Sequence, residues 1–486
     1  MRVQEYSQQV EAFLAELVAE VYRHDAGLKS ELEISPIYAR YPHLYARPAV
    51  DQLLASREDR ACRYLAEFAV SGFIANELRE LTEEISNSEA QATIEWQGDR
   101  LPYRQAPITM ANEPDLTRRH DLERRTLAET ARLNPLRAQR LRLAHKLARQ
   151  LGFPDYVALY DTLGELHLPW LARQIEGLLA RTRARHEEDL AARLRAGDIP
   201  ASEATTGDWS FLRRAQEYDS LFPKEQLLPA LTRTLAGLGI DLHAQEWLHV
   251  DVEERPLKSP RAFCAPIRIP QDVWLVIRPH GGHDDYNSIL HEAGHAEHFT
   301  HTGADLPVAY RHLGDNSVTE AYAFLFGNLQ KSPAWLRDVM GATEVADYLA
   351  LNAFTERYML RRYAAKLRYE LELHRARDLA GVDAVYAQYL GQAVGVRVWP
   401  ENFLFDLDDG FYVANYLRAW ILEVQLRLVL LREFGQTWFA KREAGAYLRD
   451  LWSLGQQFTA DELAQRLGYQ GLDAEPLIAS LVEDPR

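Results

Sequence analysis

The sequence predicts a mainly α-helical protein, and three observations support this fold class. Apolar residues recur at three- and four-residue steps through most of the chain, as they do from Val10 to Val21. β-Branched and aromatic runs are confined to short stretches. No Gly/Ser linker, low-complexity run or repeat divides the 486 residues. With 47% hydrophobic and 26% charged residues, the chain can bury a large core, and we expect one large domain or two lobes sharing an interface.

Periodicity and breaker residues place the helices in chain order. The first is expected at about 4–24, with a stripe of valine, leucine and phenylalanine. Asn134-Pro135 and Gly152-Phe153-Pro154 are expected breaks. Further helices are predicted near 49–85, 115–150, 169–196, 209–219, 224–237, 316–332, 343–379, 382–394, 411–434 and 460–467.

Extended structure is predicted in two places. A short patch at Thr93–Tyr103 carries the turn residues Gly98-Asp99. The runs Trp247–Val252, Ala262–Ile269 and Val273–Ile277 predict a small antiparallel sheet. Asp284 or Asp285 is then expected to cap a helix that carries residues 291–298.

Charge and hydropathy exclude several classes of function. The net charge of −16 argues against a general role in binding nucleic acid. No run of about 18 apolar residues occurs, and the N-terminal segment is an amphipathic helix rather than a signal peptide. Cys62 and Cys264 form neither a disulfide framework nor a metal knuckle. We therefore expect a soluble cytoplasmic protein with neither nucleic-acid nor membrane partners.

The most informative motif is His291-Glu292-Ala293-Gly294-His295. Residues four apart on a helix lie on one face, so both imidazoles can bind a single metal ion. Glu292 lies about 100° around the helix, beside the open position of that metal, where a general base is needed. The motif predicts a zinc hydrolase site.

Glu320 is the predicted third ligand. It lies 25 residues after His295 and opens an apolar helical segment, and a carboxylate there completes a His₂Glu set with one position left for water. Glu297 and His298 are rivals in sequence, but they lie on other faces of the same helix. We expect one Zn²⁺ per chain, although a site of this composition also binds cobalt or manganese.

The expected reaction is peptide hydrolysis. Zinc lowers the pKa of its bound water, and Glu292 accepts a proton from that water and passes it to the leaving amine. Amide hydrolysis builds negative charge on the carbonyl oxygen, which a phenol can stabilise. Tyr416 and Tyr412 share one helix face and are the candidates. His301 and His312 flank the connection to Glu320, and His312 is a candidate substrate-binding residue.

These residues resemble the gluzincin peptidases of the thimet oligopeptidase, oligoendopeptidase F and angiotensin-converting enzyme type. The resemblance rests on residues 291–295 with Glu320, on the stretch from Asp305 to Arg311, and on residues 412–425, in which Tyr416 matches the family's transition-state tyrosine. Residues 147–153 and 258–264 are similar more weakly. The resemblance covers about 140–430 and is strongest at 258–325.

The resemblance implies a two-lobed helical metallopeptidase with a deep central channel, zinc at its floor and short peptides as substrates. Residues 1–140 would form part of one channel wall and 141–486 the catalytic region. It also implies that an edge strand before the zinc helix binds the peptide backbone, which makes Ala262, Phe263 and Cys264 substrate-binding candidates.

Two alternatives remain open. A carboxypeptidase, including one that releases dipeptides, would use the same fold. A catalytically silent, zinc-containing peptide-binding protein is suggested by a departure from the family pattern, because the residues at 406–409 are acidic or apolar where the family has a histidine. The family's carboxylate-binding lysine is not evident either, and Phe324 rather than a hydrogen-bond acceptor follows Glu320 by one turn.

Overall fold

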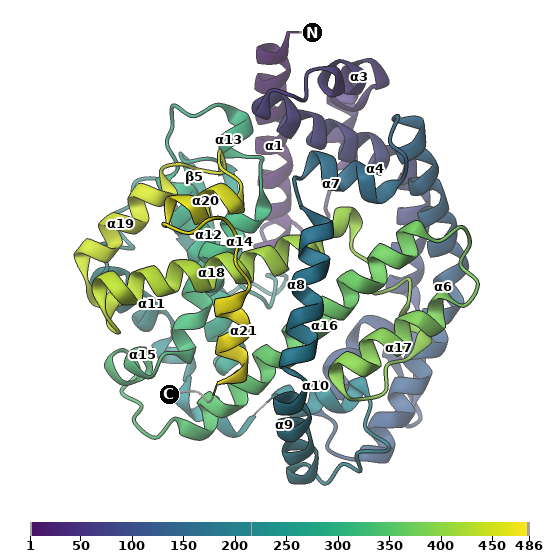
Figure 1. The fold of residues 1–486 in the computed structure, drawn as a ribbon, viewed down its shortest axis with the longest axis vertical. Coiled ribbons are helices and arrows are strands. Elements are labelled where there is room, and N and C mark those ends of the chain that lie inside the picture. The colour runs from purple at the N-terminus through teal and green to yellow at the C-terminus, as the bar shows by residue number, and fades with distance from the viewer. Residues whose placement is uncertain (1, 215, 484–486) are drawn as a thin grey trace.

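A computed structural model describes residues 2–214 and 216–483, and this part of the chain is mainly helical with two small sheets (Figure 1). The helices of the first half are α1 (Val3–Asp25), α2 (Ser35–Arg40), α3 (Arg47–Ala55), α4 (Arg60–Gln91), α5 (Ala106–Asn112), α6 (Leu116–Gln150), α7 (Tyr156–Leu163), α8 (Leu168–Arg181), α9 (Arg183–Ala196), α10 (Thr206–Arg214) and α11 (Leu227–Gly237). Those of the second half are α12 (His283–His301), α13 (Val308–Arg311), α14 (Asn316–Gly327), α15 (Pro333–Asp338), α16 (Ala346–Arg375), α17 (Val382–Val394), α18 (Tyr412–Phe434), α19 (Arg442–Trp452), α20 (Ala460–Arg466) and α21 (Glu475–Val482).

Long predicted helices agree with the structure where the apolar stripe is unbroken, as in α1, α17 and α18. Two predicted helices are each divided in two. The segment 49–85 separates into α3 and α4 because Asp59 caps a new helix, its carboxylate accepting the backbone N–H of Cys62. The segment 169–196 divides into α8 and α9 at Thr182.

The predicted break at Asn134-Pro135 is wrong, because α6 continues through Pro135. A proline inside a helix removes one hydrogen bond and frees carbonyl groups in the preceding turn. In the turn before Pro135, the guanidinium of Arg137 donates to the carbonyl of Thr130 at 2.8 Å and to the side chain of Asn134, which stabilises the helix there. The second predicted break, at 152–154, is confirmed between α6 and α7.

The sheet before α12 is mixed, so the prediction of an antiparallel sheet is wrong in part. β4 (Phe263–Arg268) pairs antiparallel with β5 (Asp272–Val276), but β3 (Leu248–Asp251) pairs parallel with β5. The strand order is β3-β5-β4, with β4 at an edge. The long connection after β3 allows this parallel pairing. The ammonium of Lys258, which lies in that connection, donates to the carboxylate and the carbonyl of Asp251 and fixes the path of the connection. The predicted patch at 93–103 is a hairpin of β1 (Thr93–Trp96) and β2 (Asp99–Pro102), with Gly98 at φ +89°.

The predicted cap of α12 by Asp284 or Asp285 is wrong, because both residues lie inside the first turn of the helix. The residue before the helix is Gly282, at φ +88°. The carboxylate of Asp285 instead accepts the backbone N–H groups of His280 and Gly281, which precede the helix. The side chain of Asp285 therefore stabilises the loop before α12 and does not bind the free N–H groups of the helix itself.

The buried apolar residues of 2–214 and 216–483 form a main cluster, a second large cluster and two small ones. The main cluster joins α1, α4, α12, α14 and α18. The second lies among α6, α9, α16 and α17, and includes Trp209, which stacks on Tyr358 with ring centroids 3.6 Å apart. In Figure 1, α19 and α15 lie on the left and α6 and α17 on the right, while α18 crosses between. The boundary expected between 140 and 141 falls inside α6, and the division into regions stays a prediction.

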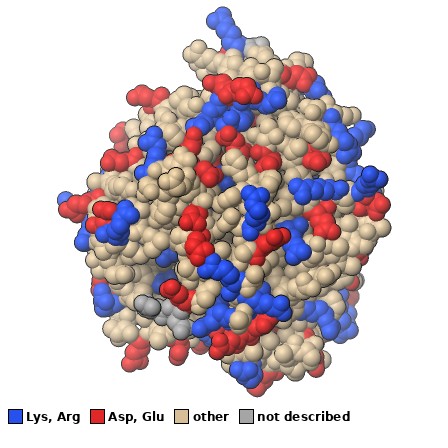
Figure 2. Space-filling model, in the orientation of Figure 1, with Lys and Arg blue, Asp and Glu red and all other residues tan. Residues whose placement is uncertain are grey.

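Lysine and arginine side chains are interspersed with acidic ones over the face shown in Figure 2. Among the described residues, no helix is both long and apolar enough to cross a membrane.

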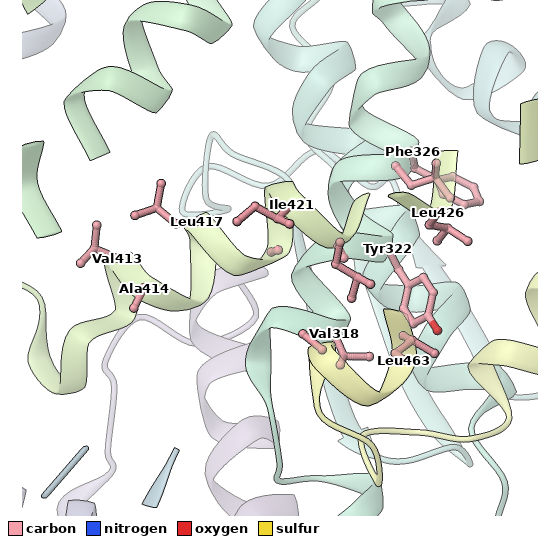
Figure 3. Close-up of a cluster of buried hydrophobic side chains, with 14 of the residues drawn as sticks. Val318, Tyr322, Phe326, Val413, Ala414, Leu417, Ile421, Leu426 and Leu463 are labelled. Atoms are coloured by element: carbon pink, nitrogen blue, oxygen red, sulfur yellow. The ribbon is translucent and has the colours of Figure 1, made fainter. Parts of the chain in front are cut away.

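The contact between α12 and α14 positions the site. Gly294 has no side chain, and a Cβ there would lie 2.6 Å from the carbonyl oxygen of Tyr322 and 2.7 Å from Cα of Ala323. Figure 3 shows Val318, Tyr322 and Phe326 of α14 packed with apolar side chains of α18 and with Leu463 of α20. Because α14 is held from behind by this cluster, it cannot withdraw to make room at Gly294.

We expect Gly294→Ala to lower the free energy of unfolding by about 1–3 kcal/mol, the usual cost of overpacking a buried contact. Urea unfolding followed by circular dichroism measures this change. The control is Gly177→Ala in α8, where a Cβ meets nothing within 4 Å. That substitution should be neutral or stabilising by up to about 1 kcal/mol, because alanine favours helix. Equal stability of Gly294→Ala and the wild type would contradict the packing argument.

Candidate metal centre

His291, His295 and Glu320 lie together, as the sequence predicts. One nitrogen of each histidine and one oxygen of Glu320 are within 4.8 Å of one another. Nε2 of His291 is 3.5 Å and Nε2 of His295 is 3.7 Å from Oε2 of Glu320. The two imidazole rings stand nearly perpendicular, at 85°. Two helices therefore supply three donor atoms to one point, the pair from α12 and the carboxylate from α14.

The donor atoms are suited to a divalent cation. Glu320 is 4% exposed, and its Oε2 is buried without a hydrogen-bond partner among the described residues. An unpartnered carboxylate oxygen is costly in a protein interior, and a metal ion removes that cost. Two nitrogens and one carboxylate oxygen form the donor set of a catalytic zinc site with a position left for water. The residues present fit zinc.

The protonation states also favour a metal ion. Burial lowers the pKa of His295 to about 4, so its imidazole is neutral at physiological pH. Burial alone would raise the pKa of Glu320, but His291, His295 and the Tyr412 hydroxyl outweigh it and lower that pKa. Ligand atoms must be deprotonated to bind a metal. Both groups meet that condition without a change in pH.

His295 has a hydrogen-bond partner that the sequence did not indicate. Its Nδ1 lies 2.8 Å from Oγ1 of Thr319, the residue just before Glu320. With Nε2 directed at the metal position, Nδ1 carries the proton and donates to the threonine, which fixes the ring orientation. Phe324, one turn after Glu320, packs against the ring of His291, with centroids 5.3 Å apart.

Thr319→Val should weaken zinc binding by about 10- to 100-fold while leaving the fold intact, because valine keeps the volume and removes the acceptor. Competition with a chromophoric chelator measures the affinity. The matched control is Thr302→Val, since the Thr302 hydroxyl bonds only to the carbonyl of His298 among the described groups. Unchanged zinc affinity in Thr319→Val would show that the hydrogen bond does not orient His295.

Glu292 lies beside the ligands and is held by the edge strand. Its Oε2 accepts the backbone N–H of Cys264 at 2.9 Å. Burial raises the pKa of this carboxyl to about 7, against the smaller opposing effects of His291 and of the Cys264 N–H group. A carboxyl group with a pKa near neutrality can both accept and return a proton. The second glutamate of this helix, Glu297, accepts a hydrogen bond from the side chain of Gln245 at 2.9 Å and does not belong to the triad.

The two candidate tyrosines occupy different positions on α18. The Tyr412 hydroxyl donates to Oε1 of Glu320 at 2.6 Å, which orients the carboxylate. Tyr416 packs against Tyr412 with ring centroids 5.0 Å apart, and its hydroxyl bonds to no described residue. Burial and then the charge of Glu320 raise the pKa of both phenols, so both remain protonated and able to donate.

Of the candidate substrate-binding residues, Cys264 contacts Glu292 directly, whereas the described contact of His312 is with another helix. Ala262 precedes β4, and Phe263 and Cys264 begin it, at the edge of the sheet. The backbone of Cys264 faces away from β5, because its N–H reaches Glu292. Because a strand repeats every two residues, the backbone of Pro266 also faces away from β5. Proline is tolerated there, since an unpaired edge needs no N–H donor. His312 follows α13, and its buried ring lies 3.9 Å from Glu11 of α1, with no described contact to the triad.

The acidic run at 406–409 is neutralised by basic residues. Arg362 donates to both oxygens of Asp406 at 2.7 Å, and the ammonium of Lys366 lies 2.9 Å from Asp408. Asp409 pairs with Arg140 of α6. Burial raises the pKa of Tyr416, and the charge of Asp408 contributes to this shift. The sequence showed that the family histidine is absent, but it did not indicate this ion-pair network.

The chain matches no protein-family model, and no curated protein is significantly similar to it.

Proposed function

We propose that this protein is a zinc-dependent peptidase that hydrolyses short peptides, of the gluzincin type that its motifs resemble. The observation that carries the proposal is the convergence of His291, His295 and the unpartnered oxygen of Glu320, with Glu292 beside them. When bound, zinc supplies Lewis-acid polarisation and lowers the pKa of a water molecule toward about 7. The remaining chemistry belongs to the protein's own side chains.

Glu292 is the proposed proton acceptor and donor. The hydrogen bond from Cys264 fixes one carboxylate oxygen, and the other is left to receive a proton from water and return it to the leaving amine. The raised pKa supports both transfers, since neither protonation state is strongly favoured at neutral pH.

Tyr412 and Tyr416 have different proposed roles. Tyr412 holds Glu320 in position through its hydroxyl, whereas Tyr416 has a donor that is not used by the described residues. We therefore assign oxyanion stabilisation to Tyr416 and ligand positioning to Tyr412. The peptide backbone would lie along the free edge of β4, where the carbonyl groups of Cys264 and Pro266 face outward. The main cluster and the second large cluster of apolar residues support a two-lobed arrangement, with the substrate channel between the lobes.

Mass-spectrometric mapping of the products from a peptide mixture tests this function. Zinc-loaded protein should cleave short peptides, and pairs with free and amidated C-termini separate the modes of attack. Cleavage of both forms indicates an endopeptidase. Cleavage of the free form alone indicates a carboxypeptidase or a dipeptidyl carboxypeptidase, which use the same chemistry. Peptide binding without any product under saturating zinc would contradict the proposal and favour a catalytically silent peptide-binding protein.

A further inference from the structure

A cavity of about 390 Å³ lies where the C-terminal ends of α6 and α16 meet. The metal triad does not line it. Four arginines surround it, together with two histidines, one aspartate and one alanine. We call it the arginine pocket and define it by Arg142, His145, Arg149, His374, Arg375 and Arg377.

Helix geometry explains how distant parts of the sequence meet here. Arg142, His145 and Arg149 are separated by three and four residues, so they lie on one face of α6. Arg375 is the last residue of α16, and Arg377 follows in the loop beyond it. Two segments more than 200 residues apart in sequence thus bring four guanidinium groups to one cavity.

The charge of the arginine pocket is not balanced by the protein. The four arginines are exposed, and none forms a hydrogen bond or ion pair with a residue in 2–214 or 216–483. Asp155 is the one acidic residue among those that line the cavity. Its carboxylate accepts the backbone N–H of Ala158 and caps α7. Such a concentration of positive charge is notable in a chain whose net charge is −16.

The two histidines line the same cavity and are held in place by their neighbours. Nε2 of His145 and Nδ1 of His374 are 2.8 Å apart, so one ring donates and the other accepts. His374 is 5% exposed and stacks on Tyr156, with ring centroids 4.3 Å apart. Its Nε2 is buried without a hydrogen-bond partner among the described residues. One of the residues that line the arginine pocket, His374, therefore has a buried ring nitrogen with no partner among the described residues.

We infer that the arginine pocket binds a small anion that carries a diphosphate group. Guanidinium groups match phosphoryl oxygens through pairs of parallel hydrogen bonds. A diphosphate offers four arginines about twice as many phosphoryl oxygens as a single phosphoryl group does. Cations also stabilise helix C-termini, which accounts for Arg149 and Arg375. That explanation does not extend to Arg142, two turns inside α6, or to Arg377, beyond the end of α16.

Isothermal titration of the full-length protein with inorganic pyrophosphate, and separately with ADP, tests the inference. We expect pyrophosphate to bind with about one equivalent per chain. The variant Arg149→Gln/Arg375→Gln should lose at least about tenfold in affinity, since it removes two charge-assisted contacts. The control Arg118→Gln/Arg195→Gln removes the same charge from exposed arginines outside the pocket and should bind as the wild type does.

The comparison also separates this site from the metal centre, because pyrophosphate bound to zinc would be unaffected by the pocket variant. Equal affinity for pyrophosphate and ADP means that the diphosphate group alone is recognised, and tighter binding of ADP means that the ligand is a nucleotide. Both results support the inference. It is overturned if neither compound binds, if the pocket variant binds pyrophosphate as tightly as the wild type, or if both variants weaken binding equally.

Discussion

Glu292→Gln should give a folded, zinc-loaded protein whose turnover of peptides is reduced by about 10²- to 10⁴-fold, the range expected when a general base is removed. The amide keeps the shape of the carboxylate and can still accept the N–H of Cys264. It cannot accept a proton from water. Steady-state hydrolysis of a quenched fluorescent peptide, with zinc content measured on the same samples, provides the comparison.

Glu297→Gln is the matched control, because it makes the same change on the same helix. Burial raises the pKa of Glu297 to about 7, so an amide resembles a form that the native carboxyl already adopts. We expect activity within a few-fold of the wild type. If Glu292→Gln retained the activity of Glu297→Gln, Glu292 would not be the proton acceptor.

The second large effect is expected at Glu320. Glu320→Gln replaces the anionic ligand by a neutral amide, so the variant should lose stoichiometric zinc and all measurable hydrolysis together. Zinc at about 100 times its dissociation constant should stabilise the wild type by about 2.7 kcal/mol and the variant far less. Thermal unfolding with and without a chelator measures that difference. Restored activity on adding zinc back to the chelated wild type is also expected, and a variant that keeps both zinc and activity would rule out Glu320 as a ligand.

The parts of the fold that could be predicted are those that local sequence determines. An unbroken apolar stripe defined α1 and α18, and Gly98 defined the β1–β2 hairpin. The errors arose where tertiary contacts decide. Pro135 lies inside α6, where Arg137 bonds to the carbonyl of Thr130 in the preceding turn, and periodicity does not reveal that contact. The parallel pairing of β3 with β5 likewise depends on the path of a loop.

The candidate site divides in the same way. Helix geometry alone brings His291 and His295 together, and a single carboxylate at the start of an apolar segment identified Glu320. Thr319 and the N–H of Cys264 could not be found from the sequence, since each acts through a contact with a distant segment. His312 was proposed because it is near the motif in sequence, but its described contacts are with α1 rather than with the triad.

The central claim is that His291, His295 and Glu320 bind one zinc ion. X-ray absorption spectroscopy at the zinc edge of the zinc-loaded protein tests it most directly. We predict one zinc per chain with two imidazole nitrogens at about 2.0–2.1 Å, oxygen ligands at about 2.0–2.2 Å and no sulfur. Loss of the imidazole signal in His291→Ala should accompany loss of the metal. A thiolate in the zinc shell, or the absence of stoichiometric zinc from folded protein, would contradict the account.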